Sequence, residues 1–255
     1  MEVVIIPNNN GYKNESDFVD FFNGMYYSEF DENTQSFLKD LFENNIDNDE
    51  FIQCWRNRMN QKADIFIKYK RRVKSISIKS GKSNSLHSES VQDFKMYLEK
   101  LNIPYKSIDY YMSYHYGYKR SEDNKKDFSK QLNAEEYKEL YQDELDDFNK
   151  CINKTRIIVD MIDRFIVRGK NSDYDIDALI SGTPNDYVWI MKHDLYDLIL
   201  SKRSLEFTSP HIACLTLGPK KRCIYGDKNI KDRYLIAVRW NFIKEDILSF
   251  YESKS

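Results

Sequence analysis

The first third of the chain contains two runs in which hydrophobic and polar positions alternate. Isoleucines alternate with polar or aromatic residues over 63–68, and isoleucines alternate with serines and a lysine over 73–79. A period of two is the mark of a β-strand, whose successive side chains point to opposite faces, and β-branched residues favour this conformation. The charged stretch 70–72 separates the runs. The pattern predicts a β-hairpin with Asp64 at its start and Lys79 at its end.

A helix is predicted after the hairpin and a polar loop at 80–85. Its apolar positions follow the three- and four-residue spacing of one helical face, namely Val91, Phe94, Leu98 and Leu101. Ser88 has the residue type of an N-cap. Glu89 then falls in the first helical turn, where the helix dipole stabilises an acid by about 0.3–1 kcal/mol.

The same periodicities define the remaining elements. Helices are predicted at 14–23, 33–45, 49–60, 193–201 and from 244 onward, with a long helical tract at 134–167 that breaks near 149–153. Strands are predicted at 2–6, 175–180, 187–190, 212–217 and 234–240, with a tyrosine-rich strand and loop at 107–118 and a charged loop at 119–130. Strands interleaved with helices predict an α/β fold.

Length and composition restrict the class of protein. The chain has 255 residues, of which 41% are hydrophobic, enough for a large core. We expect a single domain over 1–255, with a core at about 1–118 and additions at 119–255. The net charge of -2 excludes a basic field over the whole molecule, so nucleic acid would need a local basic cleft. No signal sequence or membrane-spanning run is evident, and we expect a cytoplasmic protein.

The ends of the hairpin carry a combination of residues suited to phosphodiester hydrolysis. Because strand side chains alternate, Ser77 and Lys79 project to the same side, and Asp64 faces them if it pairs at the open end. Carboxylates hold divalent cations, and a lysine stabilises the charge that develops on the phosphate. Glu89 is a further candidate acid, although the helix dipole explains it equally well. A phosphate-binding loop at Gly81 is excluded, because the motif requires another glycine five residues earlier.

Asp64 followed by a strand ending in Ser77-Ile78-Lys79 resembles the core motif of the PD-(D/E)XK nucleases, which include many type II restriction endonucleases. Ala63 stands at the position of the family's proline, and Ser77 stands at that of its second acid. One subgroup with serine there takes the missing carboxylate from the following helix, the place predicted for Glu89. The resemblance covers about forty residues of the 255.

This resemblance implies a restriction-endonuclease-like core, a central mixed sheet flanked by helices, with helical and strand additions. It implies an endonuclease that cleaves double-stranded DNA with Mg²⁺, for which Mn²⁺ may substitute as cofactor, and that acts as a homodimer. The catalytic residues would be Asp64, Lys79 and Glu89, with Asp64, Glu89 and the Ile78 carbonyl as metal ligands. Further candidates are Glu15, Ser77 and Gln92 at the site, and Lys82, Ser83, Asn84 and His87 at the DNA.

Several alternatives stay open at this point. The missing acid at Ser77 also fits a nuclease-like module without catalysis that binds DNA or protein, and the core motif fits an RNA or branched-DNA substrate as well. Glu15 either reaches the metal site from the first helix or is a polar residue at the helix edge. Arg164 and Arg168 share a helix face, where they either contact a DNA groove or pair with Asp160 and Asp163.

Overall fold

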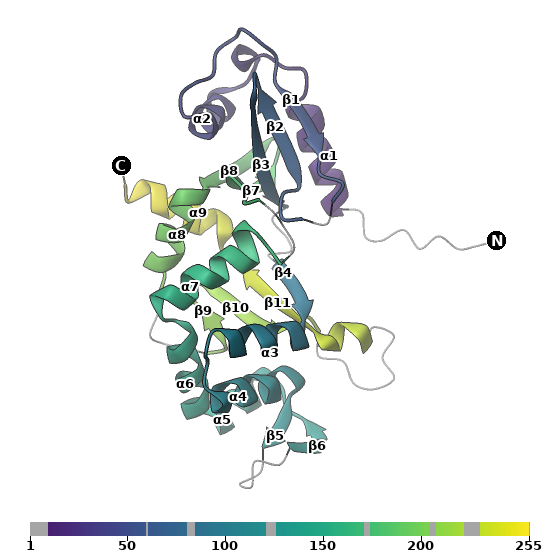
Figure 1. Cartoon of the computed structure of the whole chain (residues 1–255), viewed down its shortest axis with the longest axis vertical. Coiled ribbons are helices and arrows are strands. Elements are labelled where there is room, and N and C mark those ends of the chain that lie inside the picture. The colour runs from purple at the N-terminus through teal and green to yellow at the C-terminus, as the bar shows by residue number, and fades with distance from the viewer. Residues whose placement is uncertain are drawn as a thin grey trace, which may run out of the picture. The chain divides into compact units, whose positions relative to one another are not determined.

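The structure is a computed structural model that describes residues 10–59, 61–80, 85–120, 126–170, 174–203, 208–221 and 230–254. The chain divides into two compact units (Figure 1). The first unit comprises Met1–Asn84, Ile166–Leu198 and Phe242–Ser255, and the second comprises Ser85–Phe165 and Ile199–Asn241. The predicted strand at 2–6 lies outside the described residues.

The first unit is built around a mixed five-stranded sheet in the order β1-β2-β3-β7-β8. Its strands are β1 (Gln53–Arg56), β2 (Ile65–Tyr69), β3 (Arg72–Lys79), β7 (Ala178–Thr183) and β8 (Asp186–Met191). Only the central β3–β7 pair is parallel, and the other neighbours are antiparallel. The hairpin prediction is confirmed, since β2 pairs with β3 and Ile65 lies opposite Ile76.

Helices cover the sheet of the first unit. Helices α1 (Asn10–Phe22) and α2 (Glu32–Leu41), with a short 3-10 helix η1 (Tyr27–Glu29) between them, pack on its isoleucines, and α9 (Ile243–Glu252) packs against β7 and β8. Phe18 and Phe22 of α1, one helical turn apart, are fully buried against Ile65, Ile67 and Ile76. The Asp31 carboxylate caps α2 by accepting from the Thr34 amide at 2.8 Å. The predicted first, second and terminal helices are thereby confirmed.

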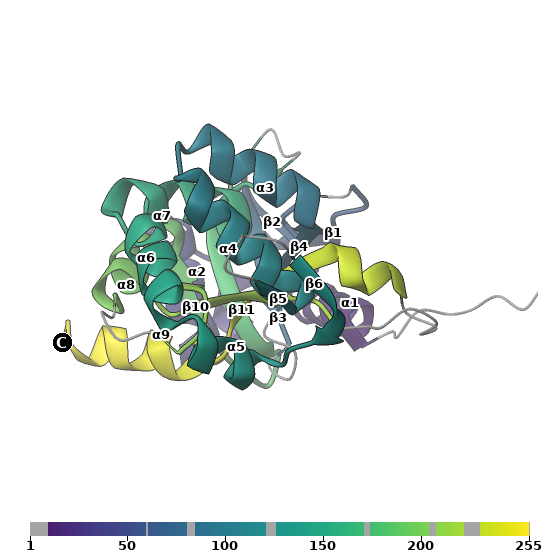
Figure 2. The same ribbon diagram turned by 90° about the horizontal axis from the view of Figure 1, so that it is seen from below.

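The second unit contains an antiparallel four-stranded sheet in the order β4-β11-β10-β9 and a separate hairpin. Its strands are β4 (Ser85–Ser90), β9 (His211–Ile212), β10 (Leu215–Pro219), β11 (Leu235–Trp240), β5 (Tyr118–Arg120) and β6 (Lys126–Gln131). Its helices are α3 (Val91–Lys100), α4 (Tyr105–Tyr116), α5 (Ala134–Leu140), α6 (Gln142–Ile152), α7 (Thr155–Ile162) and the 3-10 helix η3 (Ile230–Tyr234). Figure 2 shows α3 and α4 lying side by side. A π-helical turn, η2 (Asp163–Val167), and α8 (Lys192–Ser201) connect the two units along the chain.

Three predicted elements were wrong. The segment 49–60 contains strand β1 instead of a helix, because its alternating Ile52 and Cys54 are buried while β1 pairs along β2. The segment 107–118 is mostly helix α4, which starts after Pro104 and ends at Gly117 with a φ of 72°. The predicted charged loop at 119–130 includes the hairpin β5–β6.

The boundary of the core also differs from the sequence prediction. Strands β7 and β8 lie beyond residue 118, yet they supply two of the five strands in the sheet. Ser77 of β3 pairs with Leu179 of β7, so the sheet is completed by the later part of the chain. Among the described residues, no helix combines the length and apolar composition needed to cross a membrane.

Candidate active site

Asp64 lies directly before β2, where the backbone is fixed from two sides. Its amide donates to the Ile76 carbonyl of β3 at 2.8 Å, and its carbonyl accepts from the Asn57 amide at 2.9 Å. These bonds continue the ladder of the sheet by one residue. The sheet therefore holds Asp64 next to the end of β3.

The Asp64 carboxylate collects its partners from the last residues of β3. Its Oδ2 accepts from the Ile78 amide at 2.6 Å and from the Ser77 hydroxyl at 3.1 Å. The Lys79 ammonium nitrogen lies 3.8 Å from the same oxygen. Hydrogen bonds to an ionised acceptor are the stronger class, so they fix the orientation of the carboxylate. The structure thus brings Asp64, Ser77 and Lys79 together, as the strand alternation predicts.

The second oxygen of the Asp64 carboxylate is available to a ligand. Among the described residues, every hydrogen bond of this carboxylate ends on Oδ2 and none on Oδ1. Asp64 lines an open pocket of about 1050 Å³ in the first unit. A carboxylate oxygen that faces solvent and is held in place is a suitable ligand for Mg²⁺, which needs only one or two protein carboxylates.

Glu15 of α1 lines the same pocket as Asp64. Its Oε2 accepts from the Nε and Nη2 atoms of Arg56 at 3.2 and 2.9 Å. Burial and the charge of Asp64 raise the pKa of Glu15, against the opposing effects of Arg56 and Lys79. Two carboxylates that repel each other across one pocket fit a divalent cation, because the cation relieves this repulsion.

Two arginines of the pocket were missed by the sequence analysis. Arg56 ends β1, and Arg58 follows two residues later, exposed and without an ion-pair partner among the described residues. Both lie in the segment that was predicted to be a helix. The signal that could have located them is the alternation of Cys54 and Arg56 with the exposed Trp55, which is the pattern of a strand.

Comparison with known proteins identifies the fold. No protein-family model matches the chain, and no curated protein matches its sequence. The chain is similar to the crystal structure of the restriction endonuclease MspI in complex with its cognate DNA, with a TM-score of 0.53 over 89% of this chain and 88% of that chain. The chain has a restriction-endonuclease-like fold. At 13% identity, the similarity establishes this fold alone.

Glu89 does not occupy the helix start that was predicted for it. It lies in β4 of the second unit, opposite Ile236 of β11, and the N-cap of the following helix is Ser90 instead of Ser88. This serine-rich segment has only a weak strand signal in its sequence, and its pairing with β11 makes it a strand, which explains the error.

The carboxylate of Glu89 is held by cationic partners within the second unit. It accepts from the Nε and Nη2 atoms of Arg164 at 3.1 and 2.5 Å, and His87 Nε2 lies 3.5 Å away. Burial raises the pKa of Glu89, but the contacts with His87 and Arg164 outweigh it and hold the pKa below its ordinary value. Arg164 also lies over the Tyr97 ring at 4.3 Å. Among the described residues its ion pair is with Glu89 rather than with Asp160 or Asp163.

The remaining candidates fall in different places. Gln92 is exposed on α3 of the second unit, and His87 lies in β4 with its ring 5.2 Å from that of Phe165. Lys82, Ser83 and Asn84 lie outside the described residues. Across the described ranges, no three acidic, histidine or cysteine side chains gather as a metal-binding cluster. A cation in the Asp64 pocket would therefore be held by two carboxylates, backbone oxygen and water.

Proposed function

We propose that this chain is an endodeoxyribonuclease that hydrolyses phosphodiester bonds of double-stranded DNA with Mg²⁺, or with Mn²⁺ in its place. The observation that carries this proposal is the cluster of Asp64, Ser77 and Lys79 in a restriction-endonuclease-like fold, in which Asp64 lines a pocket of about 1050 Å³. The similar protein binds its cognate DNA, which supports duplex DNA as the partner.

In this proposal the first unit supplies the ligands of the cation. These are the free Oδ1 of Asp64, the carboxylate of Glu15 and the backbone carbonyl of Ile78. When bound, a divalent cation polarises the phosphate and lowers the pKa of water to make a nucleophile. Ser77 replaces the usual second acid of the motif as a hydrogen-bond donor that orients Asp64.

Lys79 has the role of stabilising negative charge on the scissile phosphate. Its ammonium group is 3.8 Å from Asp64 Oδ2, too far for a hydrogen bond, so its protons remain available to phosphate oxygen. The exposed Arg58, which lines the pocket of Asp64, is assigned to a neighbouring phosphate. Such a contact positions the DNA without reading its sequence.

A matched pair of lysines on β3 provides the test of this function. Lys79→Ala should lower the rate of Mg²⁺-dependent cleavage by roughly 100- to 1000-fold, the usual effect of losing one group that stabilises the transition state. Lys74→Ala, on the same strand but bound to Asp177 and Glu43, should cleave at about the wild-type rate once equally folded. Cleavage by Lys79→Ala at the rate of Lys74→Ala would contradict the assignment.

A module that binds without cleaving is the second candidate, and Ser77 in place of an acid favours it. The two candidates differ in one experiment. Wild-type protein that binds duplex DNA but cleaves none with Mg²⁺ or Mn²⁺ would support the inactive module. The homodimer stays a prediction, which sedimentation of the protein with and without DNA would check.

A further inference from the structure

Three aromatic rings lie side by side on one face of the sheet in the first unit. Trp55 of β1 is directly opposite Phe66 of β2, with ring centroids 5.7 Å apart and planes at 33°. Tyr174 lies next to Phe66 at 5.9 Å. Trp55 and Tyr174 are 39% and 38% exposed, although rings of this size are usually buried. We call these three residues the aromatic strip.

The aromatic strip shares its face of the sheet with the Asp64 cluster. Asp64, whose amide continues the ladder of the sheet by one residue before β2, is two residues from Phe66, so their side chains point the same way about 7 Å from each other. The core isoleucines Ile65 and Ile67 point to the opposite face, under α1 and α2. Trp55, Phe66 and Tyr174 line the same pocket as Asp64.

The strip also borders open space on its other side. A second hollow of about 400 Å³ is lined by the same three rings together with Val73, Ser75, Asp175 and Asp177. Trp55 and Tyr174 expose part of their rings at these hollows. The strip is therefore a ridge of rings between two hollows, accessible to a flat ligand.

The charges around the strip indicate which flat ligand fits. Arg56, which is paired with Glu15, and Arg58, which has no ion-pair partner among the described residues, line the pocket beside Trp55. The acids of the second hollow, Asp175 and Asp177, are both paired with lysine or arginine side chains. Aromatic rings bordered by guanidinium groups bind single nucleic-acid strands, in which bases stack on the rings and phosphates contact the cations. An apolar protein partner would not require these arginines.

We propose that the aromatic strip stacks an unpaired nucleobase of DNA next to the scissile phosphate. The substrate is then a duplex with a locally unpaired base beside the cleavage point, and a single strand serves as a probe of the same contact. This inference rests on the proposed nuclease function and adds the class of substrate to it. The spacing of about 7 Å between Asp64 and Phe66 allows a phosphate and a base of the same or the adjacent nucleotide to be bound together.

Tryptophan fluorescence in metal-free buffer tests the strip without requiring cleavage. Of the three tryptophans, Trp240 is fully buried and Trp189 donates its indole N–H to Asp40 at 3.0 Å, so quenching by DNA reports on the exposed Trp55. A short single-stranded oligodeoxynucleotide, and a duplex with one mismatch, should quench the emission. The fully paired duplex should quench less, and Trp55→Phe should abolish the effect. Absence of quenching by the single strand, or equal quenching by the paired duplex, would overturn the proposal.

Affinity for labelled single-stranded DNA provides the second measurement. Phe66→Leu and Trp55→Leu should each weaken binding roughly tenfold, within the range measured for one stacked base. Phe51→Leu is the matched control, because Phe51 forms another exposed aromatic pair in the first unit, with Tyr26 at 6.5 Å, outside the pocket. An equal loss in the control would overturn the proposal, and wild-type quenching decides the matter if a strip variant fails to fold.

The two proposals fail in different ways. Cleavage by the wild-type protein together with unchanged DNA affinity in both strip variants would contradict the aromatic strip and leave the nuclease function standing. Quenching that depends on Trp55, in a protein that cleaves no DNA with Mg²⁺ or Mn²⁺, would contradict the nuclease and support the strip as a binding surface.

Discussion

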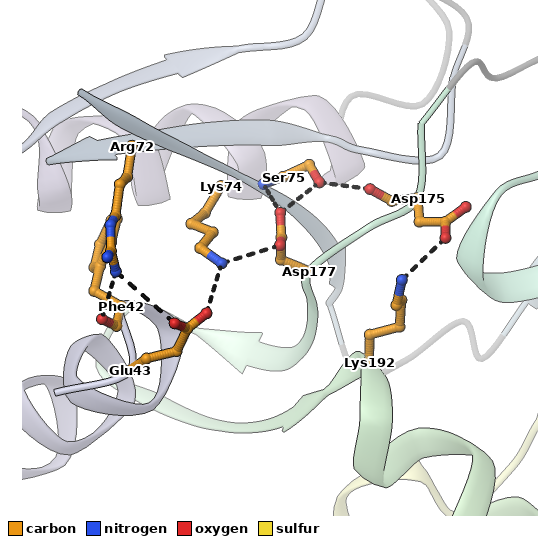
Figure 3. A network of polar contacts seen from close by, with 8 residues as sticks. All are labelled: Phe42, Glu43, Arg72, Lys74, Ser75, Asp175, Asp177 and Lys192. Carbon is orange, nitrogen blue, oxygen red and sulfur yellow. Dashed lines mark hydrogen bonds and ion pairs between the residues drawn. The ribbon is translucent and has the colours of Figure 1, made fainter. Parts of the chain in front are cut away.

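Strand β3 takes part in two clusters that contain the same three residue types. At its end, Asp64 binds Ser77 and lies near Lys79; in its middle, Asp177 binds Ser75 and Lys74 (Figure 3). In both, a carboxylate from another segment accepts from a serine hydroxyl and a backbone amide of β3. The residue types alone do not distinguish the two clusters.

The completeness of the hydrogen bonding distinguishes them. Oδ2 of Asp177 accepts from the amide and hydroxyl of Ser75, and Oδ1 lies 3.3 Å from the Lys74 ammonium. The Lys74 ammonium also forms an ion pair with Glu43 at 3.7 Å, as Figure 3 shows. In the Asp64 cluster one carboxylate oxygen is unused by the described residues, and the lysine lies at 3.8 Å. The first arrangement stabilises the fold, whereas the second has capacity for a ligand.

The largest expected difference between the clusters is in catalysis. Asp64→Asn should lower DNA cleavage roughly 100- to 1000-fold or more, because the neutral amide is a poor cation ligand and leaves Lys79 without its partner. Asp177→Asn should leave cleavage within about threefold of wild type and instead reduce the free energy of unfolding by about 1–3 kcal/mol. Cleavage assays and urea denaturation of both variants measure the contrast. An equal loss of cleavage in the two would erase the distinction.

Glu89 in the second unit is another carboxylate in which both oxygens accept hydrogen bonds, here from Arg164. Glu89→Gln should reduce the free energy of unfolding by about 3 kcal/mol, because it leaves the Arg164 charge unpaired. Since the pKa of Glu89 is lowered on folding, this contribution is present above the ordinary pKa and is lost as the pH falls through the lowered value. Urea denaturation at several pH values measures both effects.

The exposed Gln92 on the neighbouring helix provides the control for Glu89. Gln92→Ala should leave the free energy of unfolding nearly unchanged. Calorimetry with Mn²⁺ should give folded Glu89→Gln the affinity of the wild type. A lost Mn²⁺ affinity in this folded variant would restore the metal-ligand role that the sequence indicated for Glu89.

A smaller effect is expected for Glu15, the second carboxylate of the open pocket. Glu15→Gln should weaken Mn²⁺ binding roughly 10-fold, because one of the two carboxylates is lost while Asp64 remains. The wild-type affinity should fall with decreasing pH as protons compete for Glu15, whose pKa is raised, and this part of the pH dependence should be absent in the variant. Identical affinity profiles in calorimetry would exclude Glu15 from the cation site.

The sequence predicted the part of the candidate site that depends on local hydrophobic periodicity. Alternation along β2 and β3 placed Asp64, Ser77 and Lys79 together, because adjacent strands of a hairpin determine their own register. Glu89 was misplaced because β4 exists only by pairing with β11, about 150 residues later along the chain. The local sequence carries no information on such a partner, and a serine-rich segment resembles a loop.

Two other errors concern segments whose local signals were either misinterpreted or weak. The tyrosines of α4 suggested a strand, although Tyr110, Tyr111 and Tyr114 have helical spacing between Pro104 and Gly117. The misassignment of 49–60 concealed Arg56 and Arg58, since a four-residue edge strand gives little periodicity to detect. Pairing with β2 therefore decides the conformation of this segment.

Diffraction from crystals soaked in Mn²⁺ tests the central claim most directly, because the anomalous signal locates the cation without reference to activity. The account predicts a peak about 2.1 Å from Oδ1 of Asp64, with the Glu15 carboxylate as a second ligand and no peak at Asp177 or Glu89. A peak held by Asp177 or Glu89, with none at Asp64, would contradict it.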